Sequence, residues 1–297
     1  MRVLLTGAAG QLGQALQASA PAQSAGEALQ LIVCTRSELD LTDPQACRQT
    51  VLQHRPDWVL NAAAYTAVDR AEAEAELAHA VNAGAPAAMA QALAETGGRL
   101  LQLSTDFVFD GRAGSPYRPS DPVAPVSVYG ASKAAGEDAV MAHLPPAQWC
   151  ILRTSWVYGP VGSNFLLTML RLHRQRDQIA VVADQVGCPT ATAGLAQACW
   201  RVIERGVNGI QHWSDAGAAS WYDFALAIGE LGLAGGLLER AAAVQPITTA
   251  EYPTPASRPS YSLLDCTSTR STLGLLPLHW RTALAQVIGA GVSLPAP

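Results

Sequence analysis

The sequence carries few charges and no pattern of cysteines or histidines that would hold a metal. Only 14% of its 297 residues are charged, and the net charge is -5. A nucleic-acid-binding protein would show a basic stripe instead. No apolar run approaches the ~20 residues of a membrane span, and the first residues lack a signal-peptide pattern. These absences leave a compact, enzyme-sized protein that binds neither nucleic acid nor a membrane.

Six cysteines are scattered along the chain without a Cys-x-x-Cys pair. In a chain of this length, that spacing predicts reduced, mostly buried thiols and a cytoplasmic location. The six histidines are equally scattered. We find no zinc-site spacing and no Ser-His-Asp signature, so the sequence predicts neither a metal centre nor an acyl-transfer triad.

A glycine-rich turn follows the first apolar run, Met1 to Leu5. The turn contains Gly7, Gly10 and Gly13, and a helical stretch follows it. Strand, glycine turn and helix form the arrangement that binds a dinucleotide. We expect Gly7 to permit the tight turn, Gly10 to admit a pyrophosphate and Gly13 to let the helix pack closely. The alternative is a glycine-rich turn without a ligand.

The second expected strand, Leu31 to Cys34, indicates which dinucleotide binds. NAD-specific sites place a carboxylate at the end of this strand for the ribose 2′-hydroxyl. Here the strand ends in Thr35-Arg36-Ser37, and the first carboxylate is Glu38. An arginine with two hydroxyls suits a 2′-phosphate. The sequence therefore favours NADPH, with NADH possible, unless Arg36 is an ordinary solvated loop residue.

Strand-like and helical segments alternate along much of the chain. This alternation predicts an α/β fold with a Rossmann-type, doubly wound parallel sheet. We assign residues 1–165 to an NAD(P)-binding domain, to which the chain returns around 180–215, and most of 166–297 to a smaller C-terminal α/β substrate domain. The expected strands are Met1–Leu5, Leu31–Cys34, Trp58–Leu60, Arg99–Leu103, Cys150–Leu152, Ile179–Val182 and Gly209–Trp213, and the expected helices include Pro44–His54 and an Ala-rich region from Glu72 to Glu95.

Lys133 follows Tyr129 by four positions, at the start of another expected helix. Residues at this spacing lie on one helix face, so the hydroxyl and the ammonium can reach the same small volume. A free tyrosine has a pKa of about 10, and a nearby cation favours the phenolate and lowers that pKa. The pair can therefore serve as a proton donor, although a surface tyrosine beside a solvated lysine is the simpler interpretation of this motif alone.

Thr105 stands at the end of the fourth expected strand, in Ser104-Thr105-Asp106. Open α/β sheets bind their ligands at the carboxyl ends of the strands. The Thr105 hydroxyl can therefore donate a hydrogen bond to a substrate carbonyl oxygen. An ordinary strand-end turn is the alternative.

Together, the glycine turn, Asn61-Ala62-Ala63, Thr105 and Tyr129-x-x-x-Lys133 resemble the extended short-chain dehydrogenase/reductases. Further segments, spread over nearly the whole chain, resemble the dTDP-4-dehydrorhamnose reductases. They are Asn61–Asp69, Ser104–Gly111, Arg153–Gly159, Asn164-Phe165, Asp184–Thr190 and Tyr252–Pro259.

This resemblance implies that the chain reduces the C4 keto group of dTDP-4-dehydro-β-L-rhamnose to dTDP-L-rhamnose with NADPH. It implies that Tyr129 protonates the forming alkoxide, Lys133 binds the nicotinamide ribose and Thr105 polarises the carbonyl. The residues expected at the cofactor are Gly7, Gly10, Gln11, Leu12, Gly13, Arg36, Asp40, Leu41, Ala64, Tyr65, Thr66, Tyr129 and Lys133. Those expected at the sugar nucleotide are Thr105, Asp106, Tyr129, Trp156 and Arg258.

One departure concerns assembly. Some members of the family are described as joining two subunits through magnesium held by glutamates, after the glycine turn and after the Gly-x-Pro-Thr segment. The corresponding regions here, Gln14-Ala15 and Ala191–Gly194, contain no carboxylate. We therefore expect a monomer or a metal-independent homodimer, without bound magnesium.

Three alternative functions remain open at this stage. A 4,6-dehydratase would need a glutamate beside Thr105-Asp106, where this chain has Phe107. An epimerase would retain its NAD and favour an acidic residue after the second strand, which Arg36 does not supply. A regulatory subunit of the methionine adenosyltransferase type resembles the same family and acts by binding alone. The complete set of Thr105, Tyr129 and Lys133 favours catalysis, and NADPH consumption would distinguish an enzyme from a binding subunit.

Overall fold

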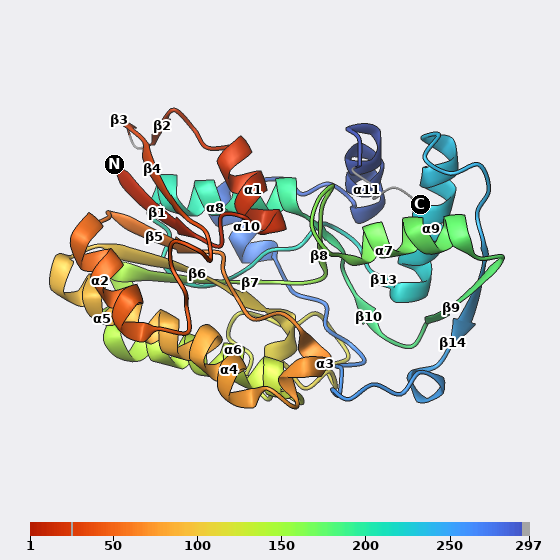
Figure 1. Ribbon diagram of the computed structural model, residues 1–297, viewed down its shortest axis with the longest axis horizontal. Coiled ribbons are helices and arrows are strands. Elements are labelled where there is room, and N and C mark those ends of the chain that lie inside the picture. The colour runs from red at the N-terminus through yellow and green to blue at the C-terminus, as the bar shows by residue number, and fades with distance from the viewer. Residues whose placement is uncertain (25, 293–297) are drawn as a thin grey trace.

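The centre of the molecule is a six-stranded sheet in the order β12-β7-β6-β5-β1-β4 (Figure 1). The structure is a computed structural model that describes residues 1–24 and 26–292. Every neighbouring pair in this sheet is parallel, which confirms the expected α/β class. The strands are β1 (Arg2–Thr6), β4 (Gln30–Cys34), β5 (Trp58–Asn61), β6 (Arg99–Thr105), β7 (Trp149–Thr154) and β12 (Gly209–His212).

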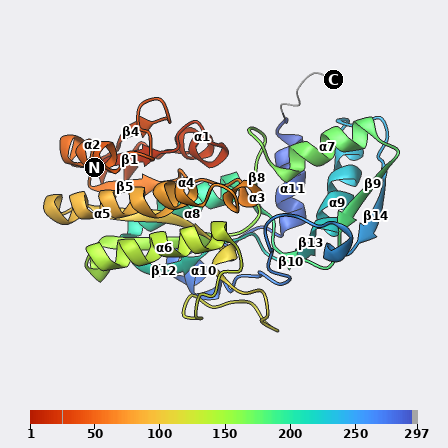
Figure 2. The same cartoon turned by 60° about the horizontal axis from the view of Figure 1, so that its bottom comes forward.

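Helices cover both faces of this sheet, and the alternation of side chains in β1 shows why. Val3 and Leu5 point to one face and pack in a core with α1 (Gln11–Ala18), α8 (Thr192–Arg205) and the end of α10 (Thr267–Leu273). Leu4 points to the other face, toward α2 (Pro44–His54), α5 (Ala85–Thr96) and α6 (Val128–His143). Because successive strand residues face opposite ways, the apolar centre of β1, Val3–Leu5, is buried between the two helical layers (Figure 1 and Figure 2).

The helix expected from Pro44 to His54 forms with those bounds. Pro44 occupies its first turn, and the Asp43 carboxylate accepts hydrogen bonds from two backbone N–H groups of that turn. This is the combination that begins a helix most reliably.

The Ala-rich region expected to be helical from Glu72 to Glu95 is helical from Ala75 onward, but it is not one regular α-helix. The region divides into α4 (Ala75–His79), a π-helical turn (Ala80–Gly84) and α5. Within the π turn, the Asn82 side chain accepts a hydrogen bond from the Tyr65 N–H (2.9 Å) and donates to the Tyr65 carbonyl (3.0 Å) and to Ser132 Oγ (2.9 Å). Single π turns often lie at functional sites, and this one fixes the segment that carries Tyr65.

A second group of elements packs around its own core beside the large sheet (Figure 1). Ile179–Val182 belongs to this group: it forms a strand, as expected, but lies outside the large sheet and pairs in parallel with β14. The core side chains include Leu170, Phe224, Ile228 and Leu284. The elements are α7 (Phe165–Gln175), β9 (Gln178–Val182), α9 (Trp221–Ala234), β14 (Ala243–Ile247) and α11 (Trp280–Gly289), with the short pairs β8 (Val157–Tyr158) with β11 (Thr190–Ala191) and β10 (Val186–Gly187) with β13 (Ala219–Ser220).

The last two helices of the described chain pack against different cores. Helix α10 packs against α8 and the large sheet, whereas α11 packs in the second core. Apolar side chains on each helix decide this partition, with Leu273 in the first core and Leu284 in the second. All six cysteines are buried and free, as predicted. Within the described residues, no helix is both long and apolar enough to span a bilayer.

Candidate active site

The glycine turn between β1 and α1 has the geometry expected of a phosphate-binding turn. Gly7 has φ +69°, a conformation that L side chains rarely adopt. A Cβ on Gly13 would lie 2.2 Å from the Gly7 carbonyl oxygen, so only glycine lets α1 pack this close. Gly10 begins α1 without a side chain to cap it. The N–H groups of the first turn of α1 are therefore available to an anion.

A cavity of about 680 Å³ opens beside this turn. It runs along the carboxyl ends of β1, β5 and β6, where an open parallel sheet binds its ligands. Gly13 is buried under the turn and lies outside the lining, and the other expected cofactor residues all line the cavity. These are Gly7, Gly10, Gln11, Leu12, Arg36, Asp40, Leu41, Ala64, Tyr65, Thr66, Tyr129 and Lys133.

One end of the cavity is lined by Arg36 and Asp40 after β4. Both side chains are exposed. The pKa of Asp40 lies below its usual value, chiefly because the backbone and side chain of Thr42 donate hydrogen bonds to it, with a smaller contribution from Arg36. Arg36 and Asp40 thus lie at the position where dinucleotide-binding sites recognise the ribose 2′ substituent.

Tyr129, Lys133 and Thr105 are brought together from two elements. Tyr129 and Lys133 occupy the first turns of α6, which begins at Ser127, whose hydroxyl accepts a hydrogen bond from the Gly130 N–H. Thr105 is the last residue of β6. All three are at most 9% exposed, and the Thr105 hydroxyl forms a hydrogen bond that lowers the pKa of Tyr129. The Lys133 ammonium donates a 2.6 Å hydrogen bond to the Leu103 carbonyl.

The pKa of Tyr129 is raised to about 12, contrary to the expectation from its spacing with Lys133. Burial is the largest cause, the negative charge of Asp106 adds to it, and the bond with Thr105 opposes it. Burial also lowers the pKa of Lys133 to about 8, although the carboxylate of Glu137 opposes the change. Tyr129 therefore keeps its proton throughout the neutral range, which suits a proton donor.

Glu137, one turn beyond Lys133 on α6, connects that helix to two strands of the large sheet. Its carboxylate accepts a 2.5 Å hydrogen bond from Ser104 and a forked pair of bonds from Arg153 Nε (2.9 Å) and Nη2 (2.6 Å). Both members of the ion pair have side chains only 3% exposed. The network connects β6, α6 and β7 one helical turn from Lys133.

Of the residues expected at the sugar nucleotide, Tyr129 lines the cofactor cavity, and the others lie outside its lining: Thr105, Asp106, Trp156 and Arg258. Asp106 adjoins Thr105, is 1% exposed, and one of its carboxylate oxygens has no partner among the described residues. Burial raises the pKa of this carboxyl to about 6. Trp156 has φ +46° and stacks on Trp221 with ring centroids 3.5 Å apart. Arg258 is paired with Asp69.

Several cavity residues were missed by the sequence interpretation. Arg70 and Glu74 line the cavity beside Tyr65, whose hydroxyl donates a 2.6 Å hydrogen bond to Glu74. Gly162 and Ser163 line it from a loop far along the chain. That loop is held by Asn164, whose side-chain amide donates to Gln11 Oε1 at 3.1 Å. The sequence motif Asn164-Phe165 does not by itself indicate the contact between Asn164 and Gln11.

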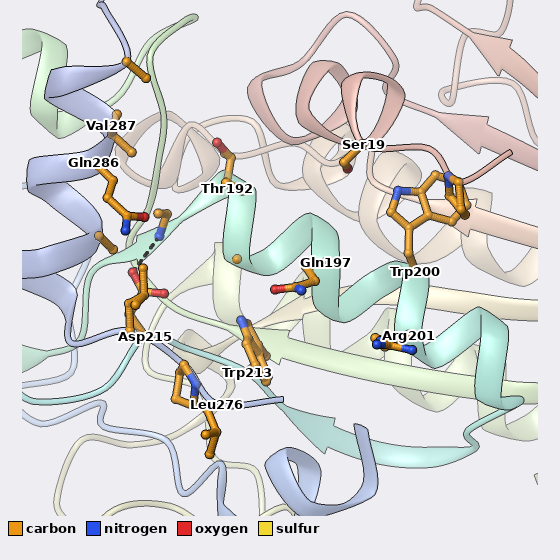
Figure 3. Close-up of a pocket in the computed structure, with 18 of the residues that line it drawn as sticks. Ser19, Thr192, Gln197, Trp200, Arg201, Trp213, Asp215, Leu276, Gln286 and Val287 are labelled. Atoms are coloured by element: carbon orange, nitrogen blue, oxygen red, sulfur yellow. Dashed lines mark hydrogen bonds between the residues drawn. The ribbon is translucent and has the colours of Figure 1, made fainter. Parts of the chain in front are cut away.

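A second cavity, of about 780 Å³, lies between α1, α8 and α11 (Figure 3). Trp200, Trp213 and Leu276 give it a largely apolar wall, and Asp215 is its buried acidic group. None of the expected site residues lines it. The candidate site is therefore the smaller cavity. In residues 1–24 and 26–292, no cluster of three or more His, Cys, Asp or Glu side chains could hold a metal ion.

Comparison with known proteins shows which family the chain is similar to. Residues 1–292 match the family model described as the RmlD substrate binding domain. A protein named dTDP-4-dehydrorhamnose reductase from Aggregatibacter actinomycetemcomitans is 40% identical over 292 residues, which cover 96% of this chain and 98% of that protein.

Two solved structures have nearly the same fold over the whole chain. The dTDP-4-dehydrorhamnose reductase from Clostridium acetobutylicum matches with a TM-score of 0.90 at 38% identity, covering 98% of this chain and 99% of that chain. The one from Bacillus anthracis, in complex with NADP, matches with a TM-score of 0.89 at 36% identity, covering 96% and 98%. The chain therefore belongs to the RmlD substrate binding domain family, the family of the dTDP-4-dehydrorhamnose reductases.

Proposed function

We propose that this protein reduces the C4 keto group of dTDP-4-dehydro-β-L-rhamnose with NADPH, forming dTDP-L-rhamnose. The observation that carries the proposal is the buried cluster of Thr105, Tyr129 and Lys133, in which Tyr129 and Lys133 line the cavity and Thr105 lies beside them. Relatives that are 40–43% identical to this chain over nearly their full length are named dTDP-4-dehydrorhamnose reductase.

The cavity fits NADPH by its backbone as well as by its side chains. The first turn of α1 offers free N–H groups to a pyrophosphate, and Gly7 and Gly13 leave no Cβ in the way. Arg36 would pair with the 2′-phosphate, and Ala64, Tyr65 and Thr66 would line the nicotinamide end. When bound, NADPH supplies the hydride.

The residues of the chain supply the proton and stabilise the charge. A carbonyl that accepts hydride develops negative charge on its oxygen, so donors aimed at that oxygen stabilise the transition state more than the substrate. Tyr129, protonated below a pKa of about 12, gives its proton to that oxygen, and Thr105 assists as a second donor. Lys133 remains largely protonated below its pKa of about 8 and would bind the nicotinamide ribose through its ammonium. Asp106, Trp156 and Arg258 would contact the sugar nucleotide.

We also propose that the protein is a cytoplasmic monomer or a metal-independent homodimer. Ala15 and the segment Ala191–Gly194 supply no carboxylate to a bridging magnesium ion, which prefers carboxylate and water oxygens.

The test is turnover of dTDP-4-dehydro-β-L-rhamnose with NADPH and NADH side by side. We expect stoichiometric conversion of NADPH and the sugar nucleotide, with NADPH preferred. NADPH binding without its oxidation would contradict the proposal and favour a regulatory binding subunit. Faster turnover with NADH would contradict the cofactor assignment alone.

A further inference from the structure

An irregular segment of the chain connects the two parts of the molecule on the substrate side. Residues 253–262, called the strap below, run between the short 3₁₀ helix Thr249–Glu251 and α10 without a helix or strand of their own. The strap forms hydrogen bonds to Gly111, in the loop after β6, and to Val186 in β10, so its position depends on contacts with both parts of the molecule.

The strongest tie is a forked ion pair between Arg258 in the strap and Asp69 in α3 (Val68–Ala71). Arg258 Nη1 donates to Asp69 Oδ1 at 3.0 Å, and Nη2 donates to Oδ2 at 2.8 Å. The Ala256 N–H adds a 3.3 Å hydrogen bond to Oδ1. Charge-assisted, two-pronged pairs of this kind fix geometry as well as adding binding energy.

Arg258 also forms hydrogen bonds to two other residues of the strap. Its Nη1 donates to Thr254 Oγ1 at 2.5 Å and to the Ala256 carbonyl at 3.2 Å. The guanidinium therefore organises the turn and attaches it to Asp69 at the same time. Lysine has the charge but not the planar fork, so it cannot replace both functions.

Beyond Arg258, the strap passes the residues expected at the sugar nucleotide. Pro259 lies so close to Gly111 that a Cβ there would be 2.6 Å from the Pro259 Cα. Ser262 lies close enough to Asp106 for its hydroxyl to lower the pKa of that carboxyl.

The strap also forms backbone hydrogen bonds with β10, which contacts Trp156. The Ser260 carbonyl accepts from the Val186 N–H, and the Ser262 N–H donates to the Val186 carbonyl, both at 2.8 Å. Gly187 follows Val186 and faces the Trp156 indole, which a Cβ on Gly187 would approach within 2.6 Å. The strap thus contacts the surroundings of both Asp106 and Trp156.

Asp69 is also next to the cofactor cavity in the chain. It lies between the cavity-lining segment Ala64–Thr66 and Arg70, which lines the cavity as well. The same ion pair therefore joins the wall of the cofactor cavity to the strap. Arg258 holds the pKa of Asp69 below its usual value, so the carboxylate keeps its charge at neutral pH.

We propose that Asp69 is a positioning residue for the sugar nucleotide: through Arg258 it fastens the strap beside Asp106 and Trp156, and it does not bind NADPH. This proposal rests on the reductase function proposed above. It assigns to α3 and the strap a role in substrate affinity that is separate from hydride and proton transfer.

The test compares Asp69→Asn and Arg258→Lys with the unmodified full-length chain. Asparagine keeps the shape of Asp69 but loses the charge, and lysine keeps the charge of Arg258 but loses the fork. We expect the KM for the sugar nucleotide to rise about tenfold or more, on the scale of one lost charge-assisted hydrogen bond. We expect a much smaller change in kcat and an unchanged dissociation constant for NADPH.

Two further variants separate positioning from general destabilisation. Asp177→Asn breaks an exposed pair with Arg240 far from the site and should leave the KM unchanged. Exchanging the two charges, Asp69→Arg with Arg258→Asp, should recover part of the protection of the strap against hydrogen–deuterium exchange that Asp69→Asn loses. An unchanged KM in Asp69→Asn, or a loss of NADPH binding that equals the loss of substrate affinity, would overturn the proposal.

Hydrogen–deuterium exchange tests the strap without any turnover. Asp69→Asn should accelerate exchange in peptides that cover residues 253–262 and leave the glycine turn unchanged. Unaltered exchange in the strap would overturn the proposal even if the enzyme were active. Faster exchange in the strap, in a protein that does not reduce the sugar nucleotide, would contradict the proposed function and not the fastening by Asp69.

Discussion

Glu137→Gln tests the buried network that Glu137 forms with Ser104 and Arg153, next to the catalytic cluster. The substitution keeps the size of the side chain but removes the charge that faces Arg153, whose side chain is 3% exposed. Removing one partner of a buried pair leaves an uncompensated charge, which costs about 3–5 kcal/mol. Ser104 also loses the carboxylate acceptor of its 2.5 Å hydrogen bond. We therefore expect the free energy of unfolding to fall by about that amount.

The same variant changes the pH dependence of catalysis. The Glu137 carboxylate opposes the burial that lowers the pKa of Lys133 to about 8. Without that carboxylate the pKa of Lys133 falls further, and the ammonium loses its proton at lower pH. Because we assign a binding role to the ammonium, the alkaline limb of kcat/KM should move to lower pH. Tyr129, with a pKa near 12, would not produce this limb.

Two assays measure these effects, and one control is available. Urea unfolding followed by intrinsic fluorescence gives the stability, and kcat/KM measured across neutral and alkaline pH gives the limb. Glu95→Gln breaks the exposed pair with Arg48 and should change neither, since exposed pairs contribute little. Wild-type stability in Glu137→Gln would refute the structural argument, and an unmoved alkaline limb would refute the coupling to Lys133.

Three further predictions follow from the cofactor cavity and from the expected assembly. Arg36→Ala should raise the KM for NADPH far more than that for NADH, because only NADPH carries the 2′-phosphate; equal effects in steady-state kinetics would place Arg36 elsewhere. Gly13→Ala puts a Cβ 2.2 Å from the Gly7 carbonyl, so thermal unfolding should show a loss of about 1–3 kcal/mol, typical of overpacking, and calorimetry should show weaker NADPH binding; wild-type values of both would contradict the close packing. EDTA should leave the mass in light scattering unchanged, and a fall from dimer to monomer would reveal metal ligands that we have not identified.

The positions of the parallel strands could be predicted because their signal is local. Trp58–Leu60 and Arg99–Leu103 are short apolar runs, and the strands found, Trp58–Asn61 and Arg99–Thr105, extend them by a residue or two. The glycine turn was equally local, since the φ of Gly7 and the close packing of Gly13 depend on neighbours in the same βα unit and the adjacent strand.

What could not be predicted depends on contacts between distant parts of the chain. The π turn at Asn82 forms where its side chain bonds Tyr65, 17 residues earlier, and Ser132, 50 residues later. Arg258 meets Asp69 across 189 residues. The sequence also could not show that burial raises the pKa of Tyr129. Spacing places Lys133 on the same helix face, but spacing does not measure desolvation.

The assignment of Tyr129 as the proton donor is the centre of the account, and Tyr129→Phe tests it most directly. The substitution removes the hydroxyl and leaves the ring against Phe107, which packs edge-on at 5.6 Å. NADPH affinity and substrate turnover should be measured on the same preparation. We predict wild-type NADPH binding and a kcat reduced by about 10²–10⁴-fold, the usual cost of losing a general acid. Turnover close to that of the wild type would contradict the assignment.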